Sequence, residues 1–401
     1  MMSKEKRRVP KLRFPGFTED WEQRKLSDIT EIVMGQSPSS KNYTDNPNDN
    51  ILIQGNADLK DGKVVPRLWT KEITKTIDKD GIILTVRAPV GDVARTDYKA
   101  VLGRGVAGIK GNDYIYQFLQ KLQNNRYWVS LSSGSTFESI NSNDIKDLII
   151  DIPSIEEQTK ISMLLNNVNS IITLHQRKLD NLKLKKKALL QKLFPKNGER
   201  YPELRFPGFT DAWEQRKLNE FLSVSNLKNT DNKYNKKDVL SVSGDYGIVN
   251  QIDFQGRSFA GASVSNYGVV EKGDIVYTKS PLKLNPYGII KTNRLNNGIV
   301  STLYAIYKTK VNCDSNFIEH YFNLDSRLNQ YLKPLVNKGA KNDMKVSSEN
   351  ALIGEVCFPK ITEQALIADL LDHLDIYITL HQRKLDHLQL QKKALLQQMF
   401  V

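Results

Sequence analysis

Few side chains in this 401-residue chain have the types and the spacing that catalysis requires. The string nearest to a phosphate-binding loop runs from Gly268 to Gly273, but it continues as Asp274-Ile275 and lacks the lysine of that motif. The triplet Asp58-Leu59-Lys60 could imitate a nuclease core, yet such triplets arise by chance in a chain rich in lysine and aspartate. Because no nucleophile, base and orienting group occur together, we expect the chain to be non-catalytic.

Metal binding and redox chemistry find equally little support. The five histidines are His175, His320, His373, His381 and His387. His175 and His381 fall at apolar-stripe positions of long helical segments, and His320 falls in a shorter amphipathic helix. Cys313 and Cys357 stand alone, without CxxC spacing, as reduced thiols of a cytoplasmic protein do. We therefore predict no metal site and no cofactor in this chain.

The composition is that of a globular protein with an anionic partner. Hydrophobic residues make up 39% of the chain, and the net charge is +13. We find no apolar run near the length of a membrane span, and the basic start of the sequence lacks the apolar core of a secretory signal. A positive surplus of this size favours nucleic acid first and an anionic membrane surface second. We expect a cytoplasmic protein without a membrane segment.

Two blocks of sequence occur twice. Pro10–Leu26 returns as Pro202–Leu218 with three substitutions, and Ile172–Phe194 returns as Ile378–Phe400. Between these blocks the two halves share almost nothing that can be aligned by eye. A constant frame around divergent middles indicates one duplicated scaffold that presents two different recognition surfaces.

The second repeated block belongs to a long helix in each half. Glu-Gln pairs at 157–158 and 363–364 follow a proline and fit a first helical turn. Apolar residues then alternate at spacings of four and three, the seam of a two-stranded coiled coil, broken in each half by one histidine and one lysine. The seam consists of Ile161, Leu165, Val168, Ile172, His175, Leu179, Leu182, Leu189, Leu193, Ile367, Leu371, Leu374, Ile378, His381, Leu385, Leu388, Leu395 and Met399, with Lys186 and Lys392 as the lysine breaks. We expect the two helices to pair antiparallel, which would bring Phe400 near the repeated block of the first half.

These patterns predict an α+β protein: two α/β recognition domains separated by a pair of long antiparallel coiled-coil helices, with a pseudo-two-fold internal repeat. The expected parts are a leading repeat segment (1–26), the first recognition domain (27–150), a central repeated region with its helix at about 156–194 (151–218), the second recognition domain (219–355), and a C-terminal repeated region with the second helix (356–401). Strands are expected at 81–87 and 273–279, and helices at 114–130 and 316–332.

The whole layout resembles the specificity subunit of a Type I restriction-modification enzyme. The resemblance covers essentially the entire chain. It is carried by the helix-start strings Pro153-Ser-Ile-Glu-Glu-Gln158 and Pro359-Lys-Ile-Thr-Glu-Gln364. Gly273-Asp-Ile-Val276 also matches the family's Gly-Asp-Ile-Leu element, and Asp80-Gly-Ile-Ile83 matches it with the first two residues exchanged.

The resemblance implies that each variable domain recognises one half of a split, asymmetric site in double-stranded DNA. The paired helices would act as a ruler for the spacer between the halves. Two methyltransferase subunits would supply S-adenosylmethionine and adenine-N6 methylation, and two restriction subunits would supply ATP- and Mg²⁺-dependent translocation and cleavage. This chain would perform none of that chemistry. The target sequence and the spacer length do not follow from the residues, because no residue-to-base code applies.

Candidate DNA contacts are polar or basic residues beside glycines and prolines, where a loop can approach DNA closely. They are Gln36, Ser37, Arg87, Arg104, Ser135 and Thr136 in the first domain, and Lys279, Ser280, Lys283, Lys338, Lys341 and Asn342 in the second. The lysine run at 183–187 is better interpreted as a solvated helix face, because the second copy has Gln389 and Gln391 in place of two of its lysines.

Two alternatives remain open from the sequence. The chain could be a non-catalytic coiled-coil adaptor whose two domains bind protein or carbohydrate ligands. It could also be an enzyme fused to its own specificity module, which would require cofactor binding by the isolated chain.

Overall fold

The computed structural model describes residues 7–132, 138–279, 281–282, 284–336 and 346–401. The chain forms two compact units: unit 1 comprises Met1–Gln176 and Gln382–Val401, and unit 2 comprises Arg177–His381. Each unit contains part of both long helices, α5 (Ile155–Lys192) and α9 (Ile361–Gln398). The helix predicted at about 156–194 therefore agrees closely with α5. None of the helices in the described residues combines the length and the apolar character needed to span a membrane.

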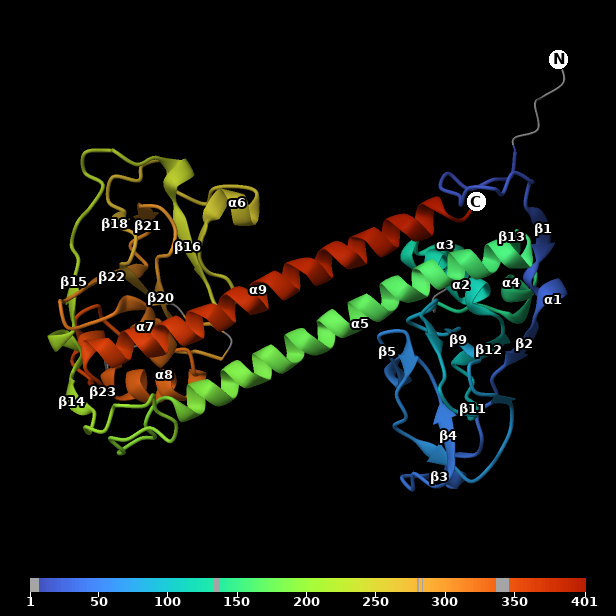
Figure 1. Ribbon diagram of the computed structural model, residues 1–401, viewed down its shortest axis with the longest axis horizontal. Helices are drawn as coiled ribbons and strands as arrows, with labels where there is room; N and C mark the ends of the chain where they lie inside the picture. The colour runs from blue at the N-terminus through green and yellow to red at the C-terminus, as the bar shows by residue number, and fades with distance from the viewer. Residues whose placement is uncertain (1–6, 133–137, 280, 283, 337–345) are drawn as a thin grey trace, which may run out of the picture. The chain divides into compact units, whose positions relative to one another are not determined.

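Unit 1 is built from three sheets and short helices (Figure 1). A two-stranded pair joins β1 (Glu22–Lys25) and β13 (Ile149–Ile152). The six-stranded sheet has the order β2 (Glu31–Met34), β12 (Val106–Lys110), β9 (Ile82–Thr85), β10 (Val93–Arg95), β6 (Lys63–Val64), β5 (Leu59–Lys60). The five-stranded sheet has the order β3 (Tyr43–Thr44), β7 (Trp69–Thr70), β4 (Asn50–Ile53), β11 (Ala100–Leu102), β8 (Thr76–Ile77). The helices are α1 (Leu26–Ile29), α2 (Asp113–Asn124), α3 (Tyr127–Ser132) and α4 (Ser142–Lys146).

Unit 2 has the same kinds of element (Figure 1). Its four-stranded sheet has the order β15 (Leu222–Val224), β22 (Tyr304–Thr309), β19 (Ile275–Thr278), β20 (Ile290–Thr292). Three strand pairs join β14 (Glu214–Lys217) to β23 (Glu355–Phe358), β16 (Leu240–Ser243) to β17 (Gly247–Asn250), and β18 (Gly268–Val270) to β21 (Gly298–Val300). The helices are α6 (Gln251–Gln255), α7 (Ser315–Tyr321) and α8 (Asp325–Leu332).

The two units share a strand order that the sequence did not reveal. The order β2-β12-β9-β10 in unit 1 is matched by β15-β22-β19-β20 in unit 2. The central strands β9 and β19 are buried at all four positions, as the apolar runs predicted for strands at 81–87 and 273–279 require. The turn before each strand is also the same, with Asp80 at a φ of 65° where unit 2 has Gly273 at 92°.

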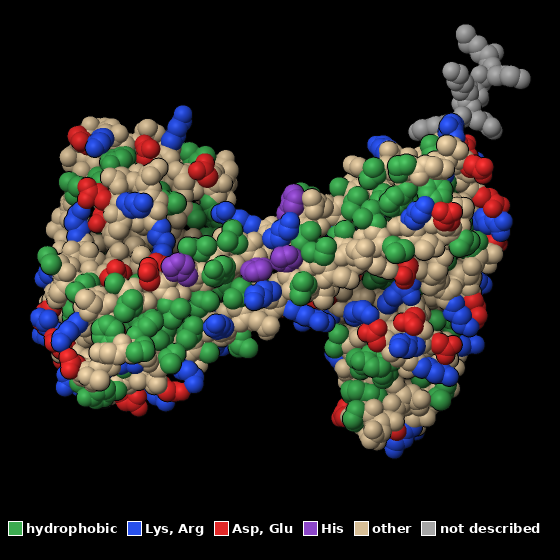
Figure 2. Space-filling model, in the orientation of Figure 1, with side chains coloured by type: hydrophobic (Ala, Val, Ile, Leu, Met, Phe, Trp, Pro, Cys, Tyr) green, Lys and Arg blue, Asp and Glu red, His purple; other side chains and the backbone are tan. Residues whose placement is uncertain are grey.

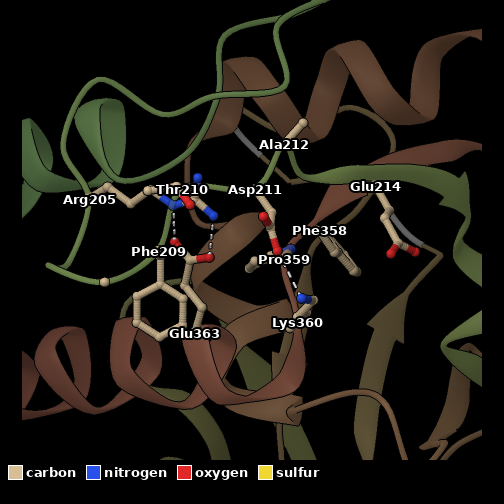
Figure 3. Close-up of a pocket in the computed structure, with 11 residues that line it drawn as sticks. Arg205, Phe209, Thr210, Asp211, Ala212, Glu214, Phe358, Pro359, Lys360 and Glu363 are labelled. Atoms are coloured by element: carbon tan, nitrogen blue, oxygen red, sulfur yellow. Dashed lines mark hydrogen bonds and ion pairs between the residues drawn. The ribbon is translucent and has the colours of Figure 1, made fainter.

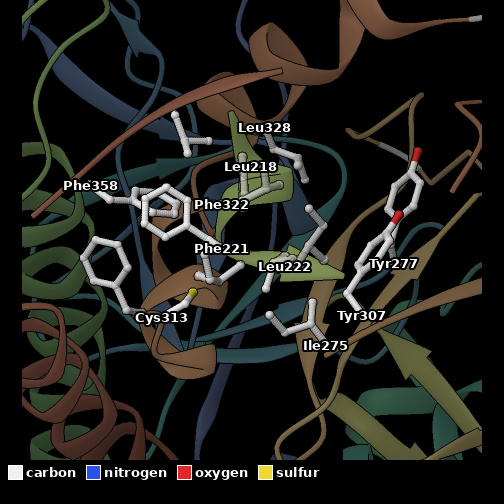
Figure 4. Close-up of a cluster of buried hydrophobic side chains, with 14 of the residues drawn as sticks. Leu218, Phe221, Leu222, Ile275, Tyr277, Tyr307, Cys313, Phe322, Leu328 and Phe358 are labelled. Carbon is white, nitrogen blue, oxygen red and sulfur yellow. The ribbon is translucent and has the colours of Figure 1, made fainter. Parts of the chain in front are cut away.

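Each predicted shorter helix is in fact two helices. The segment 114–130 divides into α2 and α3 because Arg126 has a left-handed φ of 55°, which interrupts the helix. The segment 316–332 divides into α7 and α8 at Phe322, which is 2% exposed. The chain turns there, so that Phe322 and Leu328 both enter the hydrophobic cluster drawn in Figure 4.

The long helices contribute to the core of each unit. In unit 1 the first turns of α5, with Ile161 and Leu165, belong to the same buried cluster as Leu396 and Met399 of α9. In unit 2 the last turns of α5, with Leu190, belong to the same cluster as Leu371 and Leu374 of α9. Phe400 packs against Tyr114 at a ring-centroid distance of 5.0 Å, and Leu12 N donates to Gln398 O at 2.9 Å. The expected contact between the end of the second helix and the first repeated block is therefore present.

The cysteines are free thiols, as predicted. Cys313 lies in the apolar cluster of unit 2 (Figure 4). Burial raises the pKa of its thiol to about 12, so the thiol stays protonated at neutral pH.

Replacing Gly273 by alanine should destabilise unit 2 by about 1–2 kcal/mol, because an L-residue is strained at a φ of 92°. The matched control is Gly244→Ala, since a Cβ at Gly244 meets no atom within 4 Å and its backbone is not left-handed. The control should change stability by less than about 0.5 kcal/mol. Urea unfolding of the full chain followed by circular dichroism measures both, and equal effects would contradict the strain argument.

Candidate nucleic-acid interface

The ends of four strands from two sheets meet at one place in unit 1. Backbone hydrogen bonds of 2.7–3.0 Å connect them: Gly35 N to Val106 O, Gln36 N to Leu102 O, Gly103 N to Ile53 O, and Val86 N to Gly105 O. We call the residues at this place the strand-end junction: Gly35–Ser37, Gln54–Gly55, Arg87 and Gly103–Gly105. Loop residues that are far apart in the sequence are thus brought together at one site by the ends of β2, β4, β9 and β11.

Close packing requires glycine at two positions of the junction and disfavours a larger residue at a third. A Cβ on Gly35 would collide with Gly103 O, and a Cβ on Gly105 would collide with Gln54 O. A Cβ on Gly103 would also press on the Gln54 backbone. The loops therefore approach one another more closely than side chains would permit, so the junction is a tightly packed surface.

All four described candidates of the first domain lie at this junction. Gln36, Arg87 and Arg104 are exposed, and Ser37 is half-buried. Ser37 Oγ accepts a hydrogen bond from Arg104 N at 3.0 Å, so the two candidate loops are in direct contact. Within the described part of the chain, neither Arg87 nor Arg104 pairs with a carboxylate.

The structure adds Gln54, which the sequence analysis missed. Gln54 N and Gly55 N both donate to Asp58 Oδ2, at 2.7 and 3.2 Å. Asp58 is 3% exposed, and Arg67 pairs with its other oxygen at 2.9 Å. Asp58 therefore fixes the loop that carries Gln54 and does no chemistry of its own. Gln36 was selected because it adjoins a glycine, Gly35, and Gln54 adjoins Gly55 in the same way.

Lys279 is the one second-domain candidate among the described residues. It follows β19 as Arg87 follows β9, and Lys279 N donates to Leu303 O at 3.3 Å. The remaining candidates, Ser135, Thr136, Ser280, Lys283, Lys338, Lys341 and Asn342, lie outside the described residues. For these seven, the DNA-contact role stays a prediction.

Charge alone does not locate the interface. Figure 2 shows Lys and Arg side chains interspersed with Asp and Glu over the visible face of each unit. The net charge of +13 therefore does not mark out one basic patch on this face. The unpaired arginines at the junction are a more specific indication than the net charge.

The repeated blocks form the same buried ion pair in each unit. Arg13 donates to both oxygens of Glu157, at 2.7 and 2.8 Å, and Arg205 does the same to Glu363. Both glutamates are 1% exposed and stand in the first turn of a long helix, where the helix dipole favours a carboxylate. The pair therefore fixes each leading segment to a helix start.

A pocket of about 450 Å³ lies beside the second of these pairs. Figure 3 shows the lining residues, among them Phe209 and Asp211 of the leading segment and Lys360 and Glu363 at the helix start. Asp211 accepts from Lys360 at 2.8 Å, so the charged groups that line this pocket are already paired. The pocket belongs to the repeated frame and not to a variable domain.

The predicted seam residues occupy the less exposed face of both helices. Every seam position, including the histidine and lysine breaks, is buried or half-buried. By contrast Leu174, Leu184, Leu380 and Leu390, which fall outside the seam, are 54–68% exposed. That the seam residues form a coiled coil stays a prediction at this point.

The two lysine breaks have different surroundings. Lys186 Nζ contacts both oxygens of Asp375, at 2.6 and 2.8 Å, so it is half-buried and paired and not part of a solvated face. Lys183, Lys185 and Lys187 are exposed, as the solvated-face interpretation expects. Burial lowers the pKa of Lys392, the corresponding lysine of the second copy.

One cluster in unit 2 has a geometry that a cation could use. The ligand atoms of His320, Asp372 and Asp375 lie within 4.8 Å of one another. Each carboxylate, however, already contacts a positive side chain, since Arg294 lies 2.7 Å from Asp372 and Lys186 lies 2.6 Å from Asp375. We interpret the cluster as an ion-pair network that joins α7, α9 and α5. His320 is fully buried in this network, with Nε2 2.7 Å from Asp372 Oδ1.

Comparison with known proteins agrees with this organisation. Residues 18–184 match the model of the Type I restriction modification DNA specificity domain. Two specificity subunits of Methanocaldococcus jannaschii are related in sequence. The type I restriction enzyme MjaX specificity subunit is 31% identical over 183 residues, which are 44% of this chain and 43% of that protein. The MjaIX specificity subunit is 28% identical over 234 residues, which are 52% of this chain and 53% of that protein.

Solved structures extend the likeness in fold to nearly the whole chain. The S subunit of a Type I restriction-modification system from M. genitalium has a TM-score of 0.60 at 15% identity, covering 98% of this chain and 99% of that one. A chain from a structural study of type I system assembly has a TM-score of 0.50 at 16% identity, covering 96% and 98%. The match over residues 18–184 defines a type I DNA specificity domain. The chain is similar in sequence to Type I restriction-modification specificity subunits, and the matched stretches span about half of each curated relative.

Removing one partner of the buried ion pair should destabilise unit 2. Arg205→Ala leaves Glu363 charged and unpaired at 1% exposure, and we expect a loss of roughly 3–5 kcal/mol. The control is Lys360→Ala, which breaks the exposed Asp211 pair in the same pocket and should have little effect. Equal urea midpoints for Arg205→Ala and the wild type would contradict the role given to this pair.

The ion-pair network should make stability depend on acid pH. Burial raises the pKa of Asp372, but hydrogen bonds from His320 and Arg294 outweigh burial and lower it from 3.8 to about 2. A carboxyl whose pKa falls on folding stabilises the protein above its unfolded pKa, and this stabilisation is lost as pH falls toward the folded pKa.

The stability difference between the wild type and Asp372→Asn should therefore be constant above about pH 5 and shrink between about pH 4 and pH 2. Urea unfolding at several pH values measures the difference. Asp369→Asn, an exposed change on the same helix, is the control and should follow the wild type. A difference that does not change with pH would show that Asp372 acts without its charge.

Proposed function

We propose that this chain is the DNA sequence-specificity subunit of a Type I restriction-modification complex. Each unit recognises one half of a bipartite, asymmetric site in duplex DNA. The observation that carries the proposal is a shared strand order, β2-β12-β9-β10 and β15-β22-β19-β20, that ends in loops of different sequence. The family match over residues 18–184 supports the same function.

In this proposal α5 and α9 form an antiparallel coiled coil between the two recognition domains. The half-buried or buried seam and the matched pairs Arg13–Glu157 and Arg205–Glu363 support a pseudo-two-fold internal repeat. The coiled coil sets the spacer between the half-sites. Its length bounds that spacer without fixing it, because the DNA can bend.

The catalytic activities belong to partner subunits. Two methyltransferase subunits dock on the repeated frame and bring S-adenosylmethionine, and two restriction subunits bring the ATP- and Mg²⁺-dependent activities. The two repeated sequence blocks support two methyltransferase subunits, because two identical partners need two surfaces of the same kind. The related structure from a study of type I system assembly is consistent with such a complex.

Domain exchange tests the proposal. Replacing residues 27–150 by the corresponding domain of another specificity subunit should change one half of the methylated site and leave the other half unchanged. The reciprocal exchange of residues 219–355 should change only the other half. Mapping N6-methyladenine in the DNA of cells that carry the complete system measures both results. A change in both halves after either exchange would contradict one domain per half-site.

A further inference from the structure

The turn that follows β11 in unit 1 has a counterpart after β21 in unit 2. In unit 1, Val106 N donates to Gly103 O at 3.2 Å, and in unit 2, Tyr304 N donates to Ser301 O at 3.1 Å. Each turn also receives the end of the central strand, since Val86 N donates to Gly105 O and Lys279 N donates to Leu303 O. We call residues 103–105 and 301–303 the equivalent turns.

The equivalent turns carry different side chains on the same backbone frame. The turn of unit 1 has Gly103-Arg104-Gly105, and the turn of unit 2 has Ser301-Thr302-Leu303. Arg104 and Thr302 are exposed, and Leu303 is 60% exposed. Two domains that recognise different half-sites need the same backbone position with different side chains, and the equivalent turns have both.

Arg104, like Arg87, differs from the salt-bridged arginines of unit 1 because its guanidinium has no carboxylate partner among the described residues. Arg67 pairs with Asp58 at 2.9 Å, and Arg95 pairs with Asp113 at 2.6 Å. Arg104 contacts no carboxylate within the described ranges. Its five N–H donors are therefore available to a planar acceptor such as the O6 and N7 edge of guanine.

The backbone around Arg104 is held in place. Ser37 Oγ accepts from Arg104 N at 3.0 Å, and the glycines on both sides pack against the Gln54 loop. The loop is in turn fixed by Asp58, which is 3% exposed. A rigid backbone lowers the entropy lost on binding and fixes the direction from which the guanidinium approaches.

On the basis of the proposed function, we propose that the equivalent turns are the base-recognition elements of the two domains. Arg104 forms a bidentate contact with a guanine in the half-site of unit 1. Leu303 contacts the C5-methyl group of a thymine in the half-site of unit 2.

Selection from a library of randomised DNA duplexes by the complex of this chain with its methyltransferase partner tests the proposal. Arg104→Gln should abolish the preference for guanine at one position of one half-site, lowering discrimination there by about 5- to 150-fold. Arg104→Lys keeps the charge but not the bidentate geometry, so it should also lose that preference while overall binding is retained. The matched control, Arg126→Gln, alters another exposed arginine of unit 1 and should leave the selected sequence unchanged.

Leu303→Ala gives the second arm of the experiment. It should weaken a thymine preference in the other half-site only. A loss of affinity that is uniform across sequences in Arg104→Gln, with Arg104→Lys behaving as the wild type, would show a phosphate contact and overturn the proposal. An unchanged selected sequence in either turn variant would also overturn it. If the wild-type complex itself selects no sequence, the proposed function fails, which is a separate result.

Discussion

The buried pair between an arginine of the leading segment and the glutamate in the first turn of a long helix is the contact on which each unit depends. Arg13 and Arg205 each satisfy both oxygens of a carboxylate that is 1% exposed. In each unit a strand pair, β1–β13 or β14–β23, also joins the chain just after the leading segment to the chain just before the long helix. Because each variable domain lies in sequence between the two sides of this contact, its chain ends are fixed whatever its loops contain.

Much of this frame could be predicted from the sequence, because a repeated block constrains structure wherever it occurs. The heptad pattern located α5 within a few residues and selected seam positions that are all buried or half-buried. The pattern could not show that Arg126 interrupts a helix, since a left-handed φ at arginine is set by tertiary packing and not by local preference.

The candidate interface was partly predictable, because short sequence signals for loops identified several of its residues. Gln36, Arg87 and Arg104 were selected because they adjoin a glycine or begin a loop, and the fold brings them together at the strand ends. Gln54 was missed although it shows the same signal. The agreement of strand order between the units was invisible in the sequence, because hydrogen bonding between strands depends on backbone position and tolerates almost any apolar side chain.

Each of the equivalent turns is closed by a backbone hydrogen bond, from Val106 N to Gly103 O and from Tyr304 N to Ser301 O. Each turn is tied by backbone hydrogen bonds to strands whose side chains are buried, while Arg104 in the first turn and Leu303 in the second are exposed and outside the core. Mutation at such a position carries little folding penalty. Under the proposed function, single codon changes in these turns would therefore shift the preferred bases in small steps, without the acquisition of an entire foreign domain by recombination.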